Sequence, residues 1–212
     1  MNTMKNTLTA LILGFSLIGF TSNILAGQIE QAEKKLWNEL YQNGGTTFYS
    51  KKEFTKKSPL ISATRVYSAS WIREALHCGT HRQCKKTSDQ YNRIMSDLHN
   101  IVPADSYLTF KLQHSIFGDL DESAPIIRGE LRKRDQIISP PADIKGDIAR
   151  TILYMHTKYQ LPLLMNFSLL AIWDKNDPPS QNEIAQNLKI AKIQGNENTF
   201  ISQPNIINVV KR

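Results

Sequence analysis

The segment Tyr67–Asn100 concentrates side chains that could take part in chemistry. It holds three of the five histidines and both cysteines, which are His77, His81, His99, Cys78 and Cys84. Histidine exchanges a proton near neutral pH, and cysteine either binds metal or forms a disulfide. Aromatic and basic residues are interleaved with them. This density predicts that the segment is the scaffold of a functional site.

Positive charge is concentrated in the same part of the chain. Lys51–Lys86 contains nine Lys and Arg residues against Glu53 and Glu74, a local excess of +7, equal to the net charge of the whole chain. Clustered cations displace counterions from a phosphate backbone, so this excess favours a polyanionic partner. The alternative is a solvated basic face with no ligand.

Several motifs, in a fixed order between Asn43 and Phe200, carry a resemblance to a known family. They are Tyr67-Ser-Ala-Ser-Trp71, Cys78-Gly-Thr-His-Arg-Gln-Cys84, Ser96-Asp-Leu-His-Asn100 with Pro103-Ala104, Gly146-Asp-Ile-Ala-Arg150, Leu153-Tyr-Met155 and Gln194-Gly-Asn196. Together they resemble the endonuclease I family of exported bacterial nucleases. The resemblance implies a predominantly helical α+β domain, built around a ββα-metal (His-Me finger) core that cleaves DNA or RNA.

The resemblance also implies where the chemistry should lie, and this sequence departs from the family there. Relatives use a Glu-His pair and an Asn: the Glu and Asn hold magnesium, and the His deprotonates water. These positions align with Thr64, Arg65 and Thr109, and a following family Arg aligns with Leu112. Arg65 stays protonated and cannot act as a base, and neutral hydroxyls are poor ligands for a hard cation. We therefore expect a catalytically degenerate site that needs no cofactor.

Asp97 and His99 are the fallback catalytic pair if the protein is an active magnesium-dependent nuclease. The resemblance implies that relatives keep an Asp-Leu-His-Asn motif at this place beside their own Glu-His pair. A structural role, with His99 hydrogen-bonded beneath the site, is therefore the favoured interpretation.

Nucleic acid, or another polyanion, is the expected partner. The cations expected to contact it are Arg65, Arg73, Arg82, Lys85 and Lys86. Phosphate contacts from such residues would hold a backbone without reading its sequence.

Residues 1–26 read as a cleavable signal peptide. Lys5 precedes an apolar run, Leu8–Phe20, which is too short to span a bilayer, and cleavage is expected after Ala26. The mature chain, residues 27–212, would then be a periplasmic or secreted monomer without a transmembrane segment, and one endonuclease I-like domain.

In an exported chain, Cys78 and Cys84 favour a disulfide that contributes about 2–3 kcal/mol. The alternative is zinc bound by both cysteines and His81, with His77 as a possible fourth ligand. The second cysteine pair of the usual zinc pattern is missing, so no metal is expected.

Local patterns predict the elements that must position these residues. Helices are expected over Gln28–Tyr41 and Ser88–Asn100, and strands at Ala63–Tyr67 and, as a strand or extended loop, Tyr107–Leu112. A hairpin is expected in Ile126–Ile138. Helices should also follow Asp143, Asn166 and Ser180, the last with a capping box to Glu183. Arg150, on an otherwise apolar helix, is expected to be a paired charge in the core.

Three functions are left open. The first, which we favour, is a degenerate family member that still binds nucleic acid or another polyanion. The second is an active nuclease that uses residues such as Asp97 and His99. The third is a fold reused for protein or envelope contacts.

Overall fold

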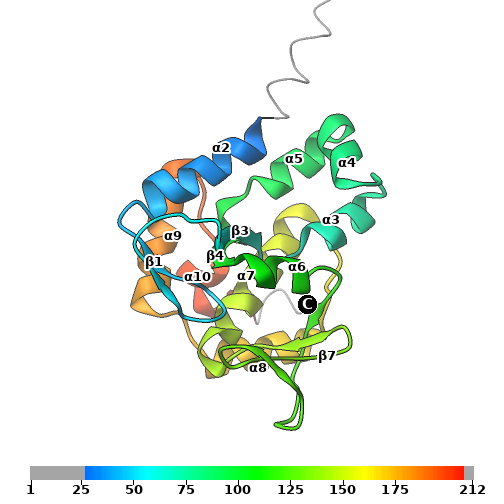
Figure 1. Cartoon of the computed structure of the whole chain (residues 1–212), viewed down its shortest axis with the longest axis vertical. Helices are drawn as coiled ribbons and strands as arrows, with labels where there is room; N and C mark the ends of the chain where they lie inside the picture. The colour runs from blue at the N-terminus through cyan, green and yellow to red at the C-terminus, as the bar shows by residue number, and fades with distance from the viewer. Residues whose placement is uncertain (1–26, 208–212) are drawn as a thin grey trace, which may run out of the picture.

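The computed structural model describes residues 27–207, so the expected signal peptide lies outside the described residues (Figure 1). The helices are α2 (Gln28–Lys35), α3 (Ala69–Leu76), α4 (His81–Thr87), α5 (Asp89–Met95), α6 (Ser106–Lys111), α7 (Lys145–Tyr159), α8 (Phe167–Asn176), α9 (Gln181–Gln194) and α10 (Thr199–Ser202). Short helical turns are η2 (Leu36–Leu40), η3 (Leu98–Asn100), η4 (Ala142–Ile144) and η5 (Pro204–Ile206). The strands are β1 (Gly45–Thr46), β2 (Glu53–Phe54), β3 (Ile61–Arg65), β4 (Ile101–Asp105), β5 (Ile116–Phe117), β6 (Ile126–Arg128), β7 (Leu131–Arg134) and β8 (Ile137–Ser139).

The antiparallel pair β3–β4 lies at the centre of the fold, and α6 follows β4 directly (Figure 1). Its register runs from Ile61 opposite Asp105 to Arg65 opposite Ile101. Just beyond β3, the buried Asn100 side chain accepts a hydrogen bond from Tyr67 N (2.7 Å) and donates one to Tyr67 O (3.0 Å). These bonds fix where β3 ends, and α3 begins two residues after Tyr67.

Two of the expected elements are wrong. The helix expected over Ser88–Asn100 ends at Met95, because Asp97 starts a new turn, η3, by accepting a hydrogen bond from His99 N (3.0 Å). The segment expected to be a strand or extended loop is the helix α6. Alternating apolar residues suggested a strand, but Leu108 and Leu112, four apart, are buried while Phe110 is 71% exposed.

The remaining expected elements are confirmed. The helix after Gln28 buries Ile29, Ala32 and Trp37 and finishes in the π-helical turn η2. The hairpin is β6–β7, and it continues into a small sheet in the order β5-β8-β7-β6. With α7, α8 and α9 also present, the domain is predominantly helical α+β. No helix within residues 27–207 is both long and apolar enough to cross a bilayer.

Helix α7 is the core helix, and it carries a fully buried arginine. Arg150 is 0% exposed and forms salt bridges with Asp147 (2.8 Å), Asp174 (2.8 Å) and Glu183 (2.6 Å). The paired-charge role expected for Arg150 is therefore confirmed. Gly146 is required beside it, because a Cβ atom there would lie 1.8 Å from the Asp177 carbonyl oxygen.

The capping box expected at α9 forms only in part. Ser180 Oγ accepts a hydrogen bond from Glu183 N (3.1 Å), as expected. The Glu183 carboxylate instead accepts two bonds from Arg150 (2.8 and 2.6 Å). Burial, aided by the charge of Asp147, still raises the pKa of Glu183. The Glu183 side chain, which would complete the capping box, thus forms an ion pair with Arg150 instead.

Replacing Arg150 with Met should lower the free energy of unfolding by about 3–5 kcal/mol, because several carboxylates would lose their buried partner. Urea denaturation measures this. Lys192→Met, an exposed change on α9, is the matched control and should shift stability by no more than about 0.5 kcal/mol. Equal effects of the two variants would contradict a buried ion-pair role.

Candidate active site

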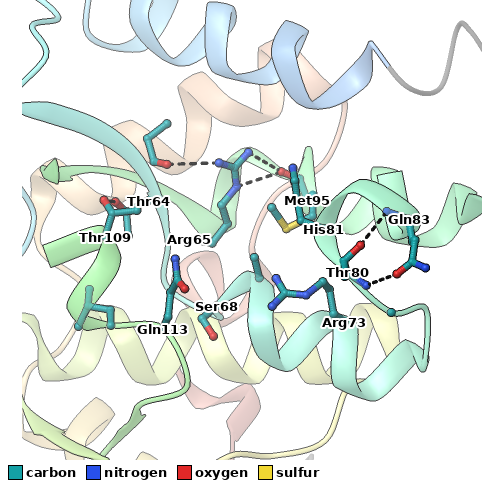
Figure 2. Close-up of a pocket in the computed structure, with 14 residues that line it drawn as sticks. Thr64, Arg65, Ser68, Arg73, Thr80, His81, Gln83, Met95, Thr109 and Gln113 are labelled. Carbon is teal, nitrogen blue, oxygen red and sulfur yellow. Dashed lines mark hydrogen bonds between the residues drawn. The ribbon is translucent and has the colours of Figure 1, made fainter. Parts of the chain in front are cut away.

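A cavity of about 640 Å³ opens between β3, α3, α4 and α6 (Figure 2). The residues that line it are Ala63, Thr64, Arg65, Ser68, Ala69, Arg73, Gly79, Thr80, His81, Gln83, Met95, Thr109, Leu112 and Gln113. Each of the four positions at which the sequence departs from the endonuclease I pattern therefore borders one cavity.

Thr64 and Thr109 meet directly in this cavity. Their hydroxyl oxygens lie 2.5 Å apart and share a hydrogen bond, although the residues are 45 positions apart in the sequence (Figure 2). Thr64 comes from β3 and is 3% exposed; Thr109 comes from α6. The structure thus brings together the two positions that the resemblance aligns with metal ligands, and their hydroxyls bind each other.

Arg65 also borders the cavity, but its charge is used inside the protein. Its guanidinium donates two hydrogen bonds to Met95 O (2.9 and 3.2 Å) and forms a 2.7 Å salt bridge with Glu33 of α2. The side chain is 8% exposed. Glu33 therefore largely neutralises the positive charge that the sequence suggested would attract phosphate.

Arg73 and His81 are the other charged or titratable residues that line the cavity. The Arg73 guanidinium extends from α3 into the space between Ser68 and His81 (Figure 2). His81 Nδ1 lies 2.7 Å from the Tyr91 hydroxyl, and either atom can donate in this hydrogen bond. Partial burial, followed by the charges of Lys85, Arg73 and Arg65, lowers the pKa of His81. The His81 imidazole and the Arg73 guanidinium thus line the same cavity.

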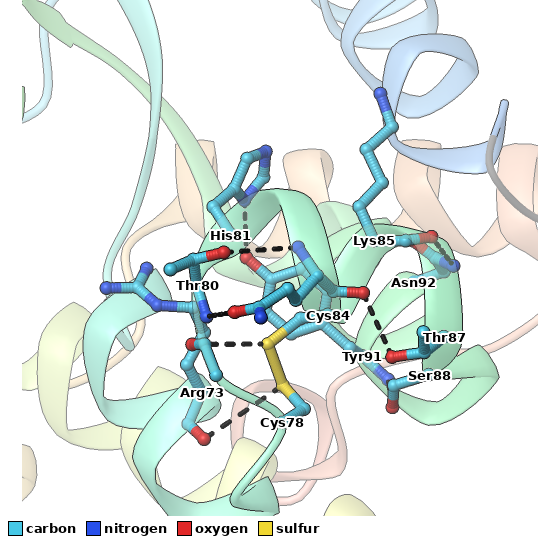
Figure 3. Close-up of a disulfide and its surroundings, with 12 residues drawn as sticks. Arg73, Cys78, Thr80, His81, Cys84, Lys85, Thr87, Ser88, Tyr91 and Asn92 are labelled. Atoms are coloured by element: carbon cyan, nitrogen blue, oxygen red, sulfur yellow. Dashed lines mark hydrogen bonds between the residues drawn. A yellow bond between two sulfur atoms is a disulfide. The ribbon is translucent and has the colours of Figure 1, made fainter.

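The three other predicted binding residues, Arg82, Lys85 and Lys86, lie on α4 outside the lining of this cavity. Lys85 reaches toward α2 and forms a salt bridge with Glu30 (Figure 3). Arg82 and Lys86 are exposed. Of the five cations expected to contact a polyanion, the structure brings only Arg65 and Arg73 to the cavity.

Asp97 and His99 do not border this cavity. Asp97 accepts hydrogen bonds from Lys158 (2.8 Å) and from the Tyr154 and Tyr159 hydroxyls (2.7 Å each). Burial would raise the pKa of Asp97, but the charge of Lys158 and these bonds outweigh burial and lower it. His99 Nε2 bonds the Asn196 carbonyl (2.9 Å), and burial lowers its pKa. This placement favours the structural role for both residues.

Comparison with known proteins identifies the relatives of the chain. Residues 2–205 match the family model described as Endonuclease I. The chain belongs to the endonuclease I family. It is 29% identical to an extracellular deoxyribonuclease of Aeromonas hydrophila, over 91% of this chain and 97% of that protein. A second extracellular deoxyribonuclease of that organism is 30% identical, over 83% and 89%, and its periplasmic deoxyribonuclease is 28% identical, over 92% and 95%.

The cavity of this endonuclease I-family protein does not offer the ligands that magnesium prefers. None of the residues that line it in the described part of the chain is Asp or Glu. Thr64 and Thr109 offer neutral hydroxyls, whereas Mg²⁺ is held by carboxylates and water. The donor set at these positions therefore does not fit the magnesium ion that the resemblance implies.

A disulfide holds the wall of the cavity formed by Gly79, Thr80 and His81. Cys78 and Cys84 are bonded, with Cα atoms 5.0 Å apart, so the expected pairing is confirmed and the zinc alternative is wrong (Figure 3). Within this loop, Gln83 N donates to Thr80 Oγ1 and Thr80 N donates to the Gln83 side chain (Figure 2). The disulfide and this capping box together fix the start of α4.

Sequence reasoning missed the neighbours that give His81 and Arg73 their setting. From the sequence, His81 was considered only as a zinc ligand. The contact of His81 with Tyr91 joins α4 to α5 at a separation of ten residues. No periodicity in the sequence indicates such a pair, because the turn between the two short helices decides which side chains face each other.

The Cys78→Ser, Cys84→Ser double variant should lose about 2 kcal/mol of unfolding free energy, because a small loop is no longer closed. Urea denaturation with and without reductant measures this: reductant should destabilise the wild type by the same amount and leave the variant unchanged. Two titratable thiols in denatured, unreduced wild-type protein would contradict the disulfide.

Proposed function

We propose that this endonuclease I-family protein binds the phosphate backbone of nucleic acid in the Arg73 cavity and does not cleave it by the metal-dependent reaction of the family. The observation that carries this proposal is the Thr64–Thr109 hydrogen bond (2.5 Å), at the two positions aligned with the magnesium ligands. The arrangement of β3, β4 and α6 supports a ββα core of the His-Me finger type. We further propose that the protein works as a monomer, and that it works outside the cytoplasm, as the words extracellular and periplasmic in the names of its relatives suggest.

Charge supports a bound backbone in this cavity. Arg73 supplies a cation, and Ser68, Thr80 and Gln113 supply neutral hydrogen-bonding groups around it. Because none of the lining residues among 27–207 is a carboxylate, a phosphate would meet no like charge from them and would need no bridging metal ion. Such contacts hold a backbone regardless of base sequence.

The second candidate function is cleavage through a different base, and one contact favours it. His81 is the imidazole that lines the cavity, and the Tyr91 hydroxyl fixes its ring. A histidine that lines the same cavity as Arg73 is a candidate general base for phosphodiester chemistry. In this candidate function, His81 takes the catalytic role that the sequence suggested for Asp97 and His99. Of these three residues, only His81 borders the cavity.

Mature protein should show no chelator-sensitive cleavage of plasmid or RNA, because neither the aligned base nor the aligned metal ligands are present. A positioned general base alone contributes about 10²–10⁴-fold. The matched variant restores the family residues: Thr64→Glu, Arg65→His, Thr109→Asn and Leu112→Arg together should introduce magnesium-dependent nicking.

Agarose electrophoresis of supercoiled plasmid, with magnesium or with chelator, measures nicking by the wild type and by the fourfold variant. Chelator-sensitive nicking by the wild type would contradict the proposal. Nicking that survives chelator and disappears in His81→Gln would instead support the second candidate.

Binding to duplex DNA should weaken with salt, with a slope of about −0.9 in log affinity against log salt for each phosphate neutralised. Arg73→Gln should make that slope less steep by about 0.9, the value for one phosphate contact, and should weaken binding to all DNA sequences alike. Lys85→Gln should have a smaller effect, because Glu30 already pairs with Lys85.

Fluorescence anisotropy between 50 and 200 mM salt is the measurement. Lys175→Gln, an exposed change on α8, is the control and should leave both affinity and slope unchanged. Absence of binding to any nucleic acid at low salt would reject the proposal and favour the reused-fold alternative.

A further inference from the structure

Helix α6, which forms one wall of the cavity, also carries an exposed aromatic surface. The side chains of Tyr107 and Phe110 are 47% and 71% exposed, one turn apart on the same side of the helix. The opposite side packs Leu108 and Leu112 into the protein, and Thr109 faces the cavity. Two aromatic rings of one short helix are therefore left to solvent.

This aromatic surface adjoins the cavity at Gln113. Gln113 N donates a hydrogen bond to Phe110 O (3.4 Å), and Gln113 lines the cavity together with Arg73. A backbone that follows the cavity past Gln113 would bring its bases next to the Phe110 ring. Phe110 and Gln113 are separated by only about one helical turn of the chain.

Cations surround the Tyr107 ring. Lys111 Nζ lies 5.5 Å from its centroid, and the Arg128 guanidinium carbon lies 5.8 Å from it. Arg128 Nε also lies 3.6 Å from a carboxylate oxygen of Asp105, which offsets part of its charge. The surface therefore combines aromatic faces with positive charge.

The combination points to one class of ligand. An exposed apolar ring alone could meet a protein or a lipid surface, because such patches mark interaction sites in general. The neighbouring cations favour an anionic partner, and nucleic acid offers both phosphates and flat base faces. In a duplex, each base is already stacked between its neighbours, so only an unpaired base can lie on these rings.

We propose that Phe110, beside the cation-covered ring of Tyr107, forms a stacking platform for an unpaired base, and that this platform makes single-stranded nucleic acid the preferred ligand of the Arg73 cavity. This inference rests on the proposed function, since the cavity holds the backbone of the same strand. Lys111 and Arg128 contact the phosphates on either side of the stacked base.

The test compares three 15-nucleotide probes by fluorescence anisotropy: a single strand, the duplex, and a strand with abasic sites at its centre. The wild type should bind the single strand more tightly than the other two. Phe110→Ala should weaken single-strand binding about tenfold, equivalent to about 1.4 kcal/mol, and change duplex and abasic binding less than twofold. Phe110→Trp should retain single-strand binding, because an aromatic face is kept.

Two controls separate stacking from other effects. Leu188→Ala removes an exposed apolar side chain from α9 (48% exposed) and should change no affinity. Phe110→Leu keeps an apolar side chain without a ring and should behave like Phe110→Ala. Because Phe110 is exposed, thermal melts of its variants should match the wild type.

Two results would overturn the platform, and they differ from failure of the proposed function. Equal binding of all three probes, with Arg73-dependent salt sensitivity, would reject the platform and leave backbone binding intact. Phe110→Leu binding the single strand as well as the wild type would show apolar contact without stacking. If the wild type bound none of the three probes but bound anionic vesicles in a way that depended on Phe110, both proposals would be rejected.

Discussion

The pairing of β3 with β4 is the constraint on which the rest of the site depends. Five residues of each strand pair antiparallel, and Asn100 then holds the backbone of Tyr67 at both its N–H and its carbonyl. This arrangement sets the direction in which α3 leaves β3. Because α6 follows β4 without a loop, the same pairing also carries Thr109 to Thr64. A few backbone and side-chain bonds therefore place two walls of the cavity.

The sequence predicted most of the large helices because their apolar residues recur with helical spacing against one core. Gln28–Lys35, Lys145–Tyr159 and the α9 segment after Ser180 are of this kind. It failed at Tyr107–Leu112, where six residues are too few to separate a period of two from a period near four. The error concerned α6, which carries both Thr109 and the exposed Phe110. Sequence reasoning was thus least reliable in the element closest to the site.

Local charge was also misleading, for a tertiary reason. The excess of +7 between Lys51 and Lys86 leaves out the acids of α2, which lie earlier in the sequence. Glu33 pairs with Arg65 and Glu30 pairs with Lys85, so two of the counted cations are neutralised by a helix packed beside them. A window of sequence cannot include such partners, because folding brings them from outside the window. Arg73, which lines the cavity together with the Glu33-paired Arg65, was not distinguished by its sequence from the other cations.

The Thr64–Thr109 contact couples two positions that lie far apart in the chain. Glutamate at position 64 alone would place a carboxylate at a site now 3% exposed, next to the Thr109 hydroxyl. Asparagine at position 109 alone would remove the hydroxyl that Thr64 now bonds. We therefore expect each single exchange toward the residues that the resemblance implies to disturb this hydrogen bond, and we expect the two positions to behave as an epistatic pair that is exchanged together more readily than one at a time.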